Sequence, residues 1–130
     1  MASSLTLGVF LLSALATVHC GTVKVWGLKG SGLNGDAAGN QPDCYVRVFC
    51  AGKDGGQTYI IDNNRNPSWN SVFTFSKVAQ SGAILKLEVW DKDLKYNDHL
   101  GTCSHSISPG THWGQCSMKK GSLSYSYSFE

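Results

Sequence analysis

The sequence shows no strong excess of charge, no internal repeat and no low-complexity segment. Eleven Lys and Arg residues stand against nine Asp and Glu residues, which gives a net charge of +2. So small a net charge favours neither nucleic acid nor any other strongly charged partner. No stretch shows a convincing helical periodicity either. We therefore expect one globular, non-helical domain that does not bind nucleic acid.

Motifs of common hydrolytic enzymes are also missing. The chain has neither the G-x-S-x-G pattern of serine hydrolases nor the H-E-x-x-H pattern of zinc proteases. A hydrolase needs a nucleophile and a base on a preformed site. The neighbouring residues Asp98 and His99 form the one pair that suggests such an arrangement. We expect a protein that is not an enzyme.

Long apolar runs are absent except at the N terminus. Residues 1–20 contain a run of Leu, Val, Phe and Ala that ends in small residues before Gly21, which predicts a secretory signal peptide. An uncleaved anchor helix is the alternative, although the run is shorter than the ~20 residues that a membrane span needs. Residues 21–130 are then a single domain of about 110 residues, large enough for one core. We expect a secreted, extracellular protein, with storage in acidic granules as a further expectation.

Four cysteines remain after the signal peptide, and an even number favours disulfides in an oxidising compartment. Cys103 and Cys116 bracket a short segment with Gly and Pro, and we expect them to form a bridge. His105 and His112 lie within the same fourteen residues, so a zinc site of two Cys and two His is the alternative.

Cys44 and Cys50 are harder to assign, because both fall in one predicted strand. In an extended strand they would lie ~20 Å apart, well beyond the roughly 7 Å that separates the Cα atoms of bridged cysteines. They can pair with each other only if the strand breaks, and a different partner for each is the alternative, so the sequence leaves their pairing open.

Short runs of alternating apolar and polar residues extend from residue 22 almost to the C terminus. The clearest is 122–129, in which Tyr125, Tyr127 and Phe129 alternate with serines. Clusters of Gly, Asn, Asp and Pro separate the runs. The expected strands are 22–28, 44–51, 57–61, 71–75, 83–90 and 122–129, with two weaker strands that flank the cysteines at 103 and 116. About eight short strands at this spacing predict an all-β fold, an antiparallel β-sandwich.

Acidic residues are concentrated in two predicted loops. Asp36 and Asp43 bound a loop rich in Gly, Ala and Asn, and Asp91, Asp93 and Asp98 follow the end of a later strand. Calcium takes six to eight oxygen ligands, of which carboxylates supply most, whereas converging carboxylates without a cation repel one another. If both loops leave one end of the sandwich, the sequence predicts a calcium site. Ordinary turn aspartates are the alternative, because Asp favours turns.

Three segments, taken in order, resemble the C2 domain, a calcium- and lipid-binding β-sandwich. They are LKGSGLNGD…PDCYVRVF, NNRNPSWNSVFTF and LKLEVWDKDLKYNDHLG, and the resemblance covers residues 22–129. Within the family, GTCSHS…HWGQC and the terminal SLSYSYSF are similar to the C2 domain at the C terminus of perforin. The C-terminal position of the extra strand implies the type II topology. Perforin's pore-forming domain has no counterpart here, so we expect no pore formation by this chain alone.

The resemblance also implies ligands for calcium. Asn97 falls where perforin has an acidic residue, and it is included in the set as a weaker donor, with the loss of one ligand as the alternative. The residues that match the family's calcium ligands are Asp36, Asp43, Asp91, Asp93 and Asp98.

A membrane contact follows from the same comparison. Leu94 and Tyr96 on the second loop are expected to enter the membrane interface, while Lys92 and Lys95 attract anionic headgroups. The alternatives are that Leu94 packs inward and that the two lysines are ordinary surface charges. The pattern also places bulky aromatic residues on the first loop, where this sequence has Asn34 and Ala37 instead.

The implied function is calcium-dependent binding to a phospholipid membrane surface, in a secreted protein of innate immunity. The alternative is a secreted immune module that binds a protein or a carbohydrate and uses calcium only for structure. The alternative predicts calcium-dependent stability without calcium-dependent lipid binding. No residue identifies a protein partner.

Overall fold

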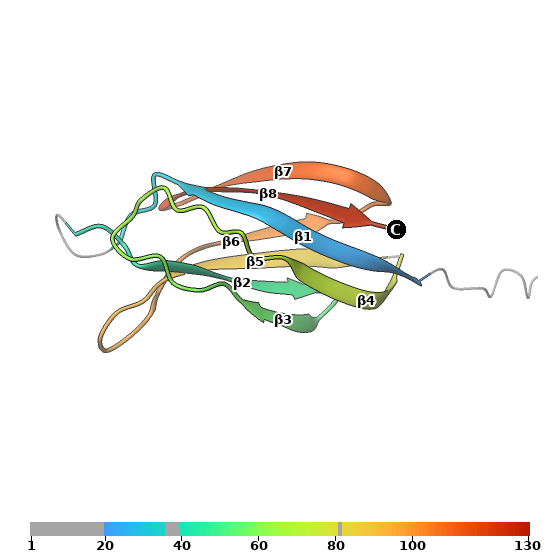
Figure 1. Cartoon of the computed structure of the whole chain (residues 1–130), viewed down its shortest axis with the longest axis horizontal. Coiled ribbons are helices and arrows are strands. Elements are labelled where there is room, and N and C mark those ends of the chain that lie inside the picture. The colour runs from blue at the N-terminus through green and yellow to red at the C-terminus, as the bar shows by residue number, and fades with distance from the viewer. Residues whose placement is uncertain (1–19, 36–39, 81) are drawn as a thin grey trace, which may run out of the picture.

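The computed structural model describes residues 20–35, 40–80 and 82–130, which form two stacked β-sheets (Figure 1). All paired strands are antiparallel, and no helix occurs in these described residues. The strands are β1 (Cys20–Ser31), β2 (Cys44–Cys50), β3 (Lys53–Gln57), β4 (Phe73–Ala79), β5 (Ile84–Asp91), β6 (Asp98–Ser106), β7 (Gly110–Met118) and β8 (Gly121–Phe129).

The strand order confirms the predicted antiparallel sandwich. One sheet has the order β4-β1-β8-β7 and the other has the order β3-β2-β5-β6. The last strand therefore lies between the first strand and β7, which is the type II arrangement. Consecutive strands are joined at the two ends of the sandwich, so loops that are far apart in sequence meet at one end (Figure 1).

The core lies between the sheets and is built from alternate side chains of each strand. On β8, Tyr125, Tyr127 and Phe129 are buried, whereas the serines between them face outward. Trp69 is also buried, and its indole N–H donates to the Tyr59 carbonyl at 2.9 Å. Each large apolar side chain buried in this way contributes about 1.5–3 kcal/mol. The core thus fixes the sheets, and the sheets fix where the loops emerge.

The third strand differs from the prediction, which placed it at 57–61. It begins directly after the turn at Ala51 and Gly52, both of which have positive φ (52° and 80°). Such a two-residue turn sets the register at once, so Lys53 pairs with Cys50 although the strand sequence KDGGQ is polar and exposed. Residues 58–61 then follow β2 less regularly, held by the bond from the Val46 amide to the Thr58 hydroxyl at 2.9 Å. Turn geometry overrode β propensity here.

Cys103 of β6 and Cys116 of β7 form the expected disulfide, with Cα atoms 6.0 Å apart. Because β6 and β7 belong to different sheets, the bridge joins the two layers of the sandwich. Both sulfurs are used in the bridge, which argues against the zinc alternative. His105 and His112 instead contact the Tyr127 ring, at 5.6 and 5.0 Å between ring centroids.

Cys44 and Cys50 are both free thiols on β2. The strand does not break, and both side chains are buried in the core, so they cannot reach each other. The general tendency of an even set of cysteines to pair thus does not hold for these two, whose pairing the sequence left open. Burial, with a smaller contribution from Asp91 and Asp43, raises the pKa of Cys44 to about 12, and burial also raises the pKa of Cys50.

Four connections gather at one end of the sandwich, opposite the start of β1 and the C terminus (Figure 1). They are the described parts of the β1–β2 connection (residues 32–35 and 40–43), residues 58–72 and 92–97, and the tight turn at 119–120. Of the predicted signal peptide, residues 1–19 lie outside the described residues, so that prediction stays open. Within the described part of the chain, no helix is long and apolar enough to cross a membrane.

Candidate metal centre

Four of the five aspartates named from the sequence line one hollow at the loop end. Asp91 closes β5 and pairs in register with Asp98, which opens β6. Asp43 immediately precedes β2, and Asp93 lies near the start of the β5–β6 loop. The hollow measures about 240 Å³ and is lined by Gly35, Asn40, Gln41, Asp43, Asn63, Asp91, Lys92, Asp93 and Asp98. Asp36, the fifth, lies outside the described residues.

Three of these carboxylates are held in the same way, each by one backbone amide. The Asn63 amide donates to Asp43 Oδ1 at 2.8 Å, and the Asp43 amide donates to Asp91 Oδ1 at 2.8 Å. Asp93 Oδ1 accepts from the Leu94 amide at 2.7 Å. The second oxygen of each group has no hydrogen-bond donor among the described residues. Each side chain is therefore oriented by one oxygen and can offer the other to a cation.

Asp91 lies deepest, with only 9% of its surface exposed. Burial raises the pKa of its carboxyl, and the nearby charges of Asp43, Asp98 and Asp93 raise it further, while the hydrogen bond from the Asp43 amide opposes them. The first loop closes over it at Gly35, where a β-carbon would meet Asp91 Oδ2 at 2.5 Å. The hollow is thus built around a carboxylate that makes no ion pair with a cation of the described residues.

The donor set suits calcium, because it consists of hard oxygen atoms and calcium prefers several carboxylates at one site. The oxygens left over on Asp43, Asp91 and Asp93 would hold the ion, together with Asp98. In the structure as it stands, no three His, Cys, Asp or Glu side chains of the described residues converge on one metal position. The carboxylates line the hollow, but three of them do not converge on a single position.

A third loop also contributes to this end, which the sequence analysis missed. Asp62 lines a second hollow of about 300 Å³ together with Asp43, Lys92, Asp93 and Leu94. The sequence feature that could have pointed to Asp62 is its position in the DNN run between two strands. The following Asn66 is structural, since its Oδ1 accepts from the Gly32 amide at 2.9 Å.

Asn97, expected to serve as a ligand, uses its side chain to brace its own loop. Its Oδ1 accepts from the Asp93 amide at 3.3 Å, and its Nδ2 donates to the Tyr45 hydroxyl at 2.9 Å. His99 is likewise engaged elsewhere: its ring lies 5.0 Å from the Trp90 ring, and its Nε2 is 2.6 Å from the Thr102 hydroxyl. These contacts fix the shape of the loop.

The four residues expected at the membrane all lie on the exposed side of the β5–β6 loop. The Leu94 side chain is fully exposed, and Tyr96 is 76% exposed. Leu94 therefore does not pack inward, which was the alternative. Lys92 and Lys95 are exposed beside them, and the Lys92 amide donates to the Asp43 carbonyl at 2.8 Å. An apolar tip flanked by cations thus projects next to the aspartates.

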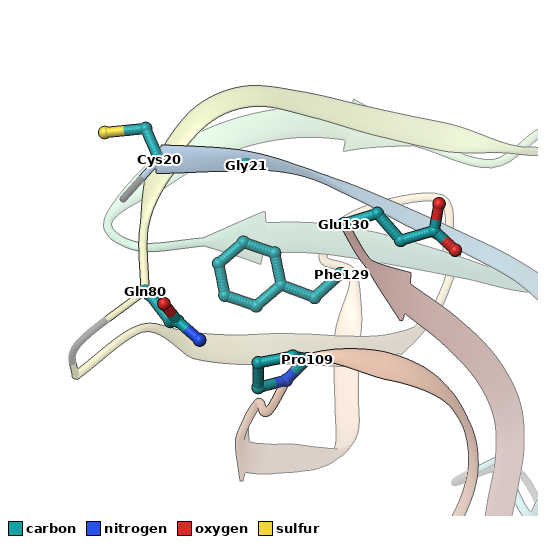
Figure 2. Close-up of a pocket in the computed structure, with 6 residues that line it drawn as sticks. All are labelled: Cys20, Gly21, Gln80, Pro109, Phe129 and Glu130. Carbon is teal, nitrogen blue, oxygen red and sulfur yellow. The ribbon is translucent and has the colours of Figure 1, made fainter. Parts of the chain in front are cut away.

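A separate hollow of about 330 Å³ lies at the other end of β1 (Figure 2). Figure 2 shows the Phe129 ring between the start of β1 and Pro109, with the Glu130 carboxylate and the Cys20 thiol directed away from the ring. Glu130 is the only carboxylate among the described residues that line this hollow. It therefore offers no cluster of hard ligands comparable to the aspartate hollow.

A two-sheet sandwich with aspartates on loops at one end defines a recognisable class. The chain belongs to the C2 domain family, whose model matches residues 21–123. C2 domains are binding modules and are generally not catalytic.

Individual proteins of this family are also similar to the chain. Human perforin-1 is 32% identical over 115 residues, which cover 87% of this chain and 20% of perforin-1. Mouse extended synaptotagmin-1 is 38% identical over 66 residues, covering 51% of this chain and 6% of that protein. The chain therefore spans about a fifth or less of the length of these relatives.

A solved C2 domain superposes with a TM-score of 0.80 at 37% identity, covering 85% of this chain and 98% of that domain. Calcium-bound C2A and C2B domains of extended synaptotagmin-2 share the fold, with a TM-score of 0.71 at 20% identity over 87% of this chain and 47% of that one.

Proposed function

We propose that this chain is a secreted, calcium-dependent module that docks onto phospholipid membranes in innate immunity. The observation that carries the proposal is the juxtaposition of four aspartates with the exposed apolar tip of Leu94 and Tyr96. The similarity to perforin-1 supports the immune setting, and the calcium-bound extended synaptotagmin-2 domains support the choice of ion.

The aspartates, the two lysines and the apolar tip contribute to docking in different ways. Without a cation, the aspartates repel anionic headgroups and hold the apolar tip away from the membrane. Calcium at this site supplies positive charge and open coordination positions for lipid phosphate oxygens. Lys92 and Lys95 add about 1 kcal/mol each at an anionic surface. Leu94 and Tyr96 gain further free energy by leaving water for the interface.

Secretion is part of the proposal and rests on different observations. Residues 1–20 have the composition of a signal peptide, and the disulfide between Cys103 and Cys116 suits an oxidising, extracellular compartment. Storage in acidic granules fits a site whose carboxylates must be ionised to bind calcium.

The test is cosedimentation with phosphatidylcholine and phosphatidylserine liposomes, in calcium and in chelator. We expect pelleting in calcium that is lost in chelator and lost in the Asp91→Asn/Asp93→Asn variant. Glu88→Gln, an acidic change on the β5 strand itself, is the matched control and should pellet like the wild type. If calcium raises the melting temperature but no lipid binds, calcium is structural and the partner is a protein or a carbohydrate.

A further inference from the structure

Two tryptophans lie in one row on the outer face of the β4-β1-β8-β7 sheet. Trp26 of β1 and Trp113 of β7 both pair in register with Ser126 of β8, the strand between them. Residues directly opposite one another in an antiparallel sheet point to the same face. Because neighbouring strands lie about 4.8 Å apart, the two side chains start roughly 10 Å from each other. Trp113 is 67% exposed and Trp26 is half-buried, so the sheet presents two aromatic rings with a polar residue between them.

The indole N–H groups of this row are not used by the protein. Trp69 and Trp90 each donate the indole N–H to an oxygen of the chain, at 2.9 and 3.2 Å. Those of Trp26 and Trp113 have no acceptor among the residues that the structure describes. A tryptophan joins a large apolar surface to one hydrogen-bond donor, and here both remain available to a bound molecule.

Hydroxyl groups lie on either side of the tryptophan row. Ser128 pairs with Thr111 on one side, and Ser124 pairs with Gln115 on the other. The hydroxyls of Ser126 and Ser128 have no hydrogen-bond partner within the described part of the chain. Since a serine hydroxyl both donates and accepts, the face offers hydrogen bonds of both kinds around the two rings.

A hollow of about 650 Å³ lies over this face, and the charge around it is uneven. Trp26, Lys24 and Ser128 are among its lining residues. The four strands of the sheet contain no Asp or Glu, whereas Lys24 and Lys29 lie on β1 on either side of Trp26. Neither lysine makes an ion pair with a described residue. Glu130 also lines the hollow, but it follows β8 on the Lys24 side, away from Lys29.

We propose that this face, here termed the tryptophan face, binds an extended acidic oligosaccharide. A sugar ring has a face of C–H groups that can stack on an indole and a rim of hydroxyls that can bond to serines and to the indole N–H. The lysines select sugars that carry a carboxylate. The tryptophan face consists of Trp26, Trp113, Ser126, Ser128, Lys24 and Lys29. None of these residues belongs to the aspartate hollow, so the inference goes beyond the proposed function and does not depend on it.

Other occupants fit this face less well. The centre of a protein interface is apolar and tightly packed, and the Ser126 hydroxyl between the two indoles would be left without a partner there. A glycan supplies that partner, because its own hydroxyls border each ring. The row also lies on the strands, rather than on the loop end that the proposed function directs toward the membrane.

The experiment is isothermal titration calorimetry with two linear hexasaccharides, one from hyaluronan, which carries carboxylates, and one from chitin, which is neutral. We expect the wild type to bind the acidic chain more tightly, and Lys24→Gln/Lys29→Gln to remove this preference. Trp113→Ala should weaken binding about tenfold or more, whereas Trp113→Phe keeps a ring and should retain most of it. Leu94→Ala/Tyr96→Ala, which removes exposed apolar side chains from the loop end, is the matched control and should bind like the wild type.

Three results would each overturn the proposal: no binding of the acidic chain, equal binding of the neutral chain, or binding that Trp113→Ala leaves unchanged. A dimer in sedimentation velocity that Trp113→Ala dissociates would also overturn it, because a second copy then covers the face. So would a loss of vesicle binding in Trp113→Ala, which assigns the face to lipid. Calcium separates this proposal from the proposed function, since saccharide binding should be the same in calcium, in chelator and in Asp91→Asn/Asp93→Asn. Saccharide binding by a wild type that pellets with no vesicle would thus support the tryptophan face and refute membrane docking.

Discussion

Asp91 shows the conflict between stability and binding at the level of one residue. Its carboxylate is buried beside three others, and its pKa is raised first by burial and then by their charges. In Asp91→Asn the Oδ1 acceptor for the Asp43 amide is kept while the charge is removed. We predict that the variant is more stable than the wild type in chelator, by about 1 kcal/mol, in thermal unfolding. It should gain no stability from calcium.

The pH dependence of this difference has a definite sign. Because the folded pKa is raised above the unfolded one, the charged carboxylate destabilises the fold at neutral pH, and protonation relieves the penalty as pH falls. The advantage of Asp91→Asn in chelator should therefore shrink toward acid pH. An advantage that stays constant with pH would contradict this electrostatic account, and a large loss of stability at neutral pH would mean that the substitution disturbs the fold.

The two cysteines of β2 offer a second test at this scale. Both are buried, and burial raises the pKa of Cys44 to about 12, so almost no thiolate forms at neutral pH. We predict that a thiol reagent leaves Cys44 and Cys50 unlabelled in the native protein and labels both in denaturant without reductant. Peptide mass spectrometry assigns the label to each of them and separates them from the disulfide-bonded Cys103 and Cys116. Rapid native labelling, or no labelling after unfolding, would contradict the assignment.

The residue types predicted some members of the candidate site, whereas the roles of the others depend on the local geometry of the loops. Asp91 and Asp93 could be named because a D-x-D step at a strand end brings two carboxylates together, and Asp43 and Asp98 because they lie on the two acidic loops. Asp62 could not be ranked above any other loop aspartate until the fold of residues 58–72 was known. For Asn97, the residue type allows a ligand, but the bond to Tyr45 gives it a bracing role that no sequence pattern specifies.

The β5–β6 loop is the element on which the proposed membrane contact depends. Its Leu94 and Tyr96 side chains are both largely exposed. We predict that Leu94→Ala/Tyr96→Ala weakens calcium-dependent vesicle binding by about tenfold to a hundredfold, since the apolar area that leaves water is lost. Val72→Ala/Ile84→Ala, two exposed apolar residues outside this loop, is the control. Calcium-induced stabilisation should be unchanged in both, and similar losses of binding would exclude a specific role for the loop.

Strands with a clear period of two were predictable as elements, and those set by turns were not. Strand β8 matches its serine-alternating run almost residue for residue. Strand β3 has the opposite character, because its five exposed residues hold no β-forming pattern and are paired by the turn that precedes them. A strand such as β8, which buries every second residue, can be recognised from its sequence. The register of β3 is instead set by a two-residue turn with positive φ, and the same two residues could equally well end a strand.

On the scale of the whole molecule, the core that stabilises the sandwich is separate from the loops that are proposed to bind calcium and lipid. The aspartates and the apolar tip lie at one end, while the disulfide links the sheets through β6 and β7. Sheet-to-sheet packing therefore positions the loops without placing core residues in the site. A change in the core should alter stability while leaving the local donor set in place.

The disulfide tests this separation. The bridge closes a loop between residues 13 apart, and such a constraint on the unfolded chain is worth about 3 kcal/mol. We predict that Cys103→Ser/Cys116→Ser lowers the free energy of unfolding by about this amount, yet still gains stability from calcium as the wild type does. Reductant should destabilise the wild type to the same level and leave the variant unchanged. If the variant instead loses its calcium response while folded, the sheets and the loop end are coupled, and docking at the loops depends on how the two layers are held together.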